Sequence, residues 1–88
     1  MRPASKKRAV ALRLYAKRRR AFLEANPVCH RCHERATDVH HMQGRVGGLL
    51  LDESKWLPLC RDCHREVTVR PRWAIEQGYS LPRVGRAS

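Results

Sequence analysis

Hydrophobic residues recur along the first part of the chain at the spacing of an amphipathic helix. Leu12, Tyr15 and Phe22 follow one another at separations of three and seven residues, and basic residues fill most of the positions between them. This pattern predicts a helix over residues 8–25. Pro27 ends it, because the residue before a proline is disfavoured in the helical conformation.

Shorter elements are predicted in the rest of the chain. They are a strand at residues 36–41, a glycine-containing loop, a second strand at 56–59, a helix that begins inside the second cysteine pair and reaches residue 69, and a short helix over 71–77. Gly78 is a typical stop for the last helix. The resulting organisation is a basic helical arm (1–25), a core domain (26–79) and a flexible basic tail (80–88).

Four cysteines are arranged as two C-x-x-C pairs. The pairs are Cys29 with Cys32 and Cys60 with Cys63, and 27 residues (33–59) separate them. Together they offer four thiolates, the ligand set of a tetrahedral structural zinc site. Two disulfides would suit a secreted protein. However, Arg13 interrupts the only apolar run near the N-terminus, so we expect no secretory signal there. A redox motif would explain one pair and not two, so we predict structural zinc.

The charge of the chain predicts its class of partner. The 88 residues form one small domain with a net charge of +11, from 19 Lys and Arg against 8 Asp and Glu. Such an excess favours a polyanion, and DNA is the expected partner. The basic face of the first helix either contacts phosphates or is simply solvated. No apolar segment is long enough to span a membrane, and we expect a cytoplasmic protein.

Three histidines lie close to the predicted cysteine cluster in the sequence. His40 and His41 end the first strand, and His64 directly follows the last cysteine. Neighbouring side chains of a strand face opposite sides, so one imidazole can hold a metal ion while the other faces a water. A zinc ion shared by the two pairs would fix the distance from this strand to the helix of His64. A metal-dependent strand-strand-helix nuclease needs this arrangement.

Three runs of the sequence resemble the HNH endonuclease family, in particular its small phage-encoded members with zinc knuckles. The runs are NPVCHRC (26–32), ATDVHH (36–41) and WLPLCRDCH (56–64), and the segment 71–78 is also similar. The resemblance implies an α+β fold with a small zinc-stapled ββα-metal core, a basic N-terminal helix and a short C-terminal helix. It also implies that His41 is the general base and that His40 and His64 bind a catalytic Mg²⁺, Mn²⁺, Ni²⁺ or Zn²⁺ ion.

The activity implied by the resemblance is hydrolysis of DNA phosphodiester bonds with low sequence specificity, by an endonuclease or nickase. The family further implies a phage-encoded protein that works beside the terminase during genome packaging, in the cytoplasm of a bacterial host. A monomer and a homodimer are both compatible with the sequence. The residues expected to contact DNA are Arg18, Arg19, Arg20, Arg45 and Lys55.

Two positions depart from the family pattern. Lys55 stands where the family has its asparagine, and a lysine only donates hydrogen bonds. Thr68 stands where many members have another metal-binding histidine. These departures keep open a catalytically inactive zinc-knuckle module that binds nucleic acid. A zinc protein that binds an acidic protein partner is the third reading, and salt-dependent DNA binding would count against it.

Overall fold

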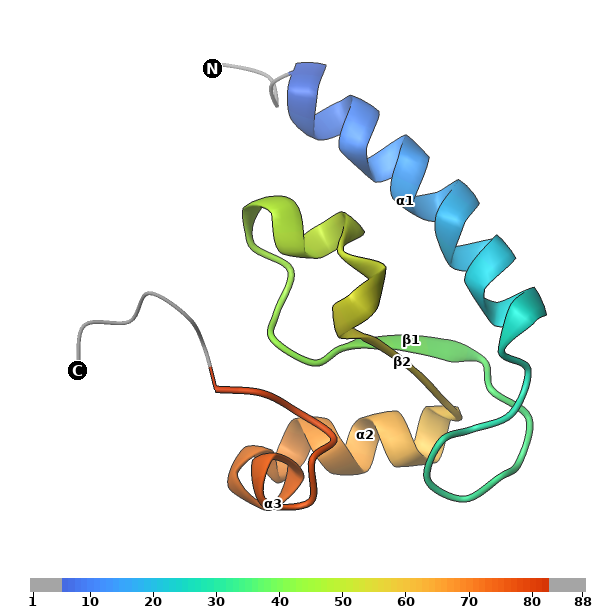
Figure 1. Ribbon diagram of the computed structural model, residues 1–88, viewed down its shortest axis with the longest axis vertical. Coiled ribbons are helices and arrows are strands. Elements are labelled where there is room, and N and C mark those ends of the chain that lie inside the picture. Colours follow the sequence, from blue (N-terminus) through green and yellow to red (C-terminus); the bar gives the residue numbers. More distant parts are fainter. Residues whose placement is uncertain (1–5, 83–88) are drawn as a thin grey trace.

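The computed structural model describes residues 6–82 (Figure 1). Its helices are α1 (Lys6–Ala25), α2 (Arg61–Val69) and α3 (Pro71–Glu76), and its strands are β1 (Asp38–His41) and β2 (Trp56–Leu59). Two short 3-10 helices, η1 (Gly47–Leu51) and η2 (Glu53–Lys55), lie in the connection between the strands. The described part of the chain is therefore a small α+β structure.

The two strands form an antiparallel pair in the middle of the molecule. His41 is opposite Trp56, and Asp38 is opposite Leu59. Figure 1 shows α1 on one side of the pair and α2 on the other. Because side chains alternate along a strand, each strand presents one set of residues to α1 and the other set to α2.

Two small clusters hold the layers together. Leu59 and Val67 are buried beside Cys29 and Cys63, so the cysteine pairs are themselves part of the core between β2 and α2. On the other side, the Trp56 ring packs edge-on against Tyr15 and Phe22 of α1, with ring centroids 5.6 and 5.3 Å apart. No residue of α1 is fully buried, and the helix contacts both Trp56 and η1.

The predicted elements are all present, with shifted boundaries. Helix α1 begins at Lys6, two residues before the predicted start. Strand β1 omits Ala36 and Thr37, although their backbone N–H groups still donate to the carbonyls of Pro27 and Leu59. The apolar run 49–51 forms most of η1, which buries Leu50. No helix within residues 6–82 is long and apolar enough to cross a membrane.

The segment after α3 returns to the strands. The backbone N–H of Leu81 donates to the carbonyl of Met42 over 2.7 Å, and the Gln43 side chain donates to the carbonyl of Pro82 over 2.8 Å. The first three residues of the predicted flexible tail are thus attached beside the end of β1. The other residues of that tail, 83–88, lie outside the described residues, as do residues 1–5.

We predict that the core depends on Leu59. Its side chain is fully buried, so Leu59→Ala should lower the free energy of unfolding by about 2–5 kcal/mol through lost burial and the cavity left behind. Val46→Ala is the control, because Val46 is 76% exposed and should change stability by less than about 0.5 kcal/mol. Urea unfolding of both variants measures the difference, and equal losses would contradict the assignment of the core.

Candidate metal centre and histidine groove

The four cysteines converge on one point. Their sulfur atoms all lie within 4.8 Å of one another, and Sγ of Cys32 is 3.6 Å from Sγ of Cys60. A tetrahedral zinc with Zn–S bonds of about 2.3 Å places its sulfurs about 3.8 Å apart, so this spacing fits the ion. All four residues are free cysteines. Within residues 6–82, only this cluster brings three or more potential metal-ligand side chains so close together.

The local backbone favours a thiolate at Cys29, whereas burial raises the pKa of the Cys63 thiol to about 12. Backbone N–H groups of Cys32 and Cys63 point at the sulfurs of Cys29 and Cys60, at 3.5 and 3.4 Å. Burial alone would raise the pKa of the Cys29 thiol, but such N–H donors, with Cys32 first, lower it to about 6. The Arg31 guanidinium also donates to Sγ of Cys63 over 3.4 Å. The donor set and its surroundings therefore fit a structural metal such as zinc.

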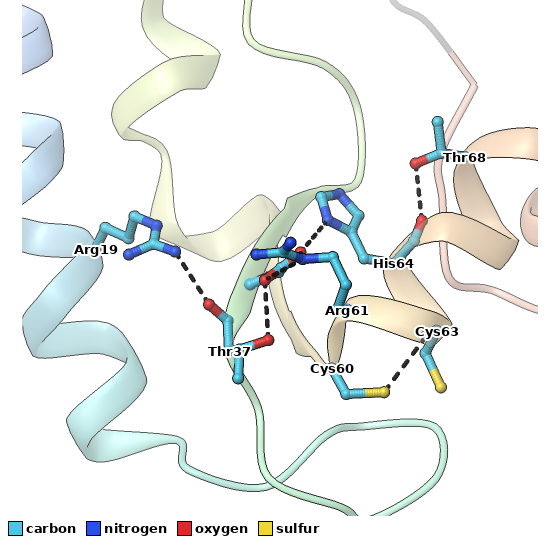
Figure 2. A network of polar contacts seen from close by, with 8 residues as sticks. Arg19, Thr37, Cys60, Arg61, Cys63, His64 and Thr68 are labelled. Carbon is cyan, nitrogen blue, oxygen red and sulfur yellow. Dashed lines mark hydrogen bonds and ion pairs between the residues drawn. The ribbon is translucent and has the colours of Figure 1, made fainter.

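A groove runs along the edge of β1, between α1 and α2. We call it the histidine groove, and its cavity volume is about 460 Å³. It is lined by Tyr15, Arg19, Asp38, Val39, His41, Arg45, Arg61, His64 and Thr68. Figure 2 shows Arg19 reaching in from α1, with Arg61 and His64 on the α2 side of the strand. Two of the three predicted site histidines thus line one groove, beside three arginines.

His64 is held by a carboxylate. Its Nδ1 is 2.9 Å from Oδ2 of Asp38, and Arg61 donates to the same carboxylate over 3.1 Å (Figure 2). Asp38 is mostly buried; burial raises its pKa, but the hydrogen bonds from His64, Thr37 and Arg61 outweigh this effect and lower it. Asp38 is therefore charged near neutral pH, and Nε2 is the His64 nitrogen that remains for a metal ion or a phosphate.

His41 lies on the α1 side of the strand, in an aromatic surrounding. Its ring centroid is 5.3 Å from that of Tyr15 and 5.6 Å from that of Trp56. Nε2 is buried and has no hydrogen-bond partner. Desolvation and then the positive charge of Arg45 lower the pKa of His41, so its imidazole is neutral around pH 7. A neutral imidazole is the form that can accept a proton.

His40 faces the opposite side of β1, as alternation requires, and is not among the residues that line the histidine groove. Its side chain is buried, and Nε2 is 2.9 Å from the hydroxyl of Ser80. Desolvation, followed by the nearby His64, lowers the pKa of His40 to about 4. The His40 and His64 rings are nevertheless neighbours, with centroids 5.3 Å apart.

The predicted DNA-contacting residues are distributed over several surfaces. Arg19 and Arg45 line the histidine groove, and the Arg45 guanidinium stacks 5.1 Å above the Tyr15 ring. Arg20 lines a different groove. Nη1 of Arg18 lies 3.9 Å from Oε2 of Glu53, and Lys55 is the last residue of η2. Neither residue lines either groove.

The two departures from the family pattern have identifiable places. The backbone carbonyl of Lys55 accepts from the N–H of Met42 over 2.8 Å, which ties the start of the inter-strand connection to its end. This contact uses the main chain, whereas the Lys55 side chain has no part in it. The hydroxyl of Thr68 donates to the carbonyl of His64 over 2.8 Å, so it is engaged within α2 (Figure 2).

The structure brings into the site two groups that were not among the predicted site residues. Asp38, which shares a strand face with His40, pairs with Arg61 and orients His64. Ser80 was expected in a flexible tail, yet it holds His40. The alternation of β1 is a usable signal for Asp38, because it puts Asp38 on the α2 side. No local signal points to Ser80, which is 40 residues from His40.

Comparison of the chain with protein-family models, curated proteins and solved structures found no match.

The cysteine cluster predicts one tightly bound metal ion per chain. Cys29→Ser should lose the metal and unfold, whereas His30→Asn, which changes an exposed knuckle histidine, should keep it. Metal analysis of the purified proteins and the absorption of a Co²⁺-substituted sample measure this. Chelation should unfold the wild type, so a chain that keeps its circular dichroism spectrum without metal would contradict the assignment.

Burial of His40 predicts a loss of stability in acid. Its pKa is about 4 in the folded protein, below the ordinary value of 6.5, so the unfolded chain binds this proton at higher pH. Stability should therefore fall as the pH drops from about 6.5 towards 4, by on the order of 1–3 kcal/mol. Urea unfolding at both ends of this range should show a smaller loss for His40→Asn. An equal loss in both proteins would assign the acid sensitivity to other groups.

Proposed function

We propose that this protein is a divalent-metal-dependent DNA endonuclease or nickase of the HNH type. The observation that carries the proposal is the histidine groove, where His41 from the end of β1 and His64 from the start of α2 meet around one cavity. One imidazole comes from the strand and the other from the helix, and both line a groove that also holds three arginines. These side chains suit a site that handles a proton and an anion together.

The arginines of the groove provide the substrate contacts in this proposal. Arg19 and Arg45 line the groove beside the two histidines and have no carboxylate partner among the described residues, and the whole chain has a net charge of +11. Guanidinium groups bind phosphate oxygens through paired, charge-assisted hydrogen bonds. A phosphodiester that enters the groove would therefore be held next to the imidazoles. Few side chains are available to read base edges, so low sequence specificity is expected.

His41 is the proposed general base. Its lowered pKa keeps the imidazole neutral near pH 7, the form that would accept a proton from the attacking water. Tyr15 and Trp56 hold the ring from two sides, which limits its rotation. The water would attack phosphorus, and the bond to the leaving 3′ oxygen would break, leaving a 5′-phosphate and a 3′-hydroxyl.

His64 and His40 are the proposed ligands of the catalytic divalent ion. Such an ion would supply positive charge to the scissile phosphate and the leaving oxygen. Asp38 contributes by fixing His64 through Nδ1, so that Nε2 faces outward. The fit of His40 is partial, because its Nε2 is engaged by Ser80. His40 also has a hydrogen bond to the backbone of Tyr79, so it would bind the ion only after these contacts are exchanged.

The alternative is a zinc-knuckle module that binds nucleic acid and has no catalytic activity. The hydrogen bond between His40 and Ser80 favours it, because it occupies one expected ligand. Thr68 also favours this alternative. Its hydroxyl donates to the carbonyl of His64, and a threonine at this position adds no histidine ligand for a metal ion. Both functions use the same arginines, so DNA binding alone does not separate them.

Plasmid nicking separates the two functions. In the presence of Mg²⁺, Mn²⁺ or Ni²⁺, we expect the wild type to nick supercoiled DNA and His41→Ala to lose at least about a hundredfold in rate, the usual contribution of a general base. His30→Ala is the matched control, since it removes an exposed histidine outside the groove and should keep full activity. Gel retardation of the same proteins measures DNA affinity.

Each outcome has a defined meaning. Loss of nicking in His41→Ala with unchanged DNA affinity supports the endonuclease. No nicking by the wild type with any of the ions, together with retained DNA binding, would favour the module without catalytic activity. Equal nicking by the wild type and His41→Ala would contradict the role of His41 and indicate a contaminating nuclease.

A further inference from the structure

A second groove lies along the C-terminal half of α1, beside the segment that leads into β1. We call it the arginine groove, and its cavity volume is about 580 Å³. It is lined by Ala16, Arg19, Arg20, Leu23, Glu24, Pro27, Arg35, Ala36 and Thr37. None of these residues except Arg19 belongs to the histidine groove.

Arg19 is the point where the two grooves meet. Its guanidinium donates to the carbonyl of Thr37 over 3.0 Å, immediately before β1 begins (Figure 2). This bond holds the side chain across the gap between α1 and the strand. It uses one of the five guanidinium N–H groups, so others remain for an anion on either side. The two cavities therefore adjoin at this side chain.

The arginine groove has an excess of positive charge. Three arginines against Glu24 give its lining a formal charge of +2 (3 − 1). None of the ion pairs between described residues involves Arg20, Arg35 or Glu24, whereas Arg18, Arg61 and Arg70 each face a carboxylate. Arg20 and Arg35 are also exposed. Arginines that are left without a carboxylate partner at a groove are suited to bind an external anion.

The rest of the lining is apolar or small. Leu23, Pro27 and Ala36 contribute to it, and Ala36 is buried. Cationic side chains beside an apolar surface match the alternation of phosphate and deoxyribose along a nucleic-acid strand. A small inorganic anion would use the arginines and leave this apolar surface uncovered.

We propose that the arginine groove binds the DNA backbone at phosphates that flank the one held in the histidine groove. The inference rests on the proposed function, because that function places a phosphodiester next to Arg19. The strand would continue past Arg19 and along α1, so that Arg20 and Arg35 contact phosphates outside the reacting position. An acidic protein segment is the competing occupant, and continuity with the histidine groove favours DNA.

The test is the salt dependence of DNA binding. Fluorescence anisotropy of a labelled duplex is measured at several salt concentrations with His41→Ala as the parent, in buffer without added divalent ions and without chelator. Adding Arg20→Ala and Arg35→Ala should reduce the slope of log affinity against log salt by about 1.8, at about 0.9 per lost phosphate contact. The affinity near physiological salt should fall about tenfold or more.

The control removes the same charge elsewhere. Arg65 and Arg72 are exposed on α2 and α3 and line neither groove, so Arg65→Ala with Arg72→Ala should leave the slope nearly unchanged. Arg20→Lys with Arg35→Lys keeps the charge and should retain most of the slope. Metal content and circular dichroism establish that every variant is folded.

The outcomes distinguish this inference from the proposed function. Equal losses in the two alanine pairs would overturn it, because they would show a general effect of charge. Binding of labelled poly-glutamate that depends on Arg20 and Arg35, with DNA binding unaffected, would assign the groove to an acidic protein partner. A protein that never nicks DNA but shows the expected difference in slope would refute the endonuclease and retain the backbone groove.

Discussion

The cluster of four cysteines is the constraint on which the rest of this structure depends. Cys29 and Cys63 are buried in the same core as Leu59 and Val67, so the proposed metal site and the hydrophobic core are one unit. A chain of 88 residues buries little apolar surface, and a shared metal ion would compensate by joining two distant segments. The same junction fixes α2 against the strands and thereby sets the distance from His64 to β1.

Strand β1 divides the site between two environments. His41 faces α1 and its aromatic residues, and His40 faces α2 and Ser80, because adjacent side chains of a strand point to opposite sides. The histidine groove follows the edge of β1 that is not paired with β2, so residues from both faces can line it. The chemistry proposed here therefore depends on a strand with one open edge, flanked by two helices.

The use of arginine differs between the parts of the molecule. Some arginines serve the fold: Arg61 holds Asp38, and Arg70 pairs with Glu66 over 2.7 Å. Others face grooves without a carboxylate partner, as Arg20 and Arg35 do. The net charge of the chain indicates an anionic partner but does not separate these groups. Only their neighbours in space show which arginines are available to bind it.

Local patterns in the sequence determined the elements of this protein and the four cysteines that could hold a metal ion. The apolar spacing around Tyr15 defines α1, Pro27 ends it, and the two C-x-x-C pairs identify the four sulfurs, because each signal acts over a few neighbouring residues. The tertiary structure alone decided that Ser80 holds His40, that Asp38 orients His64 and that Arg19 joins two grooves. These contacts join residues 18 to 40 positions apart, and their formation depends on how the helices pack on the strands.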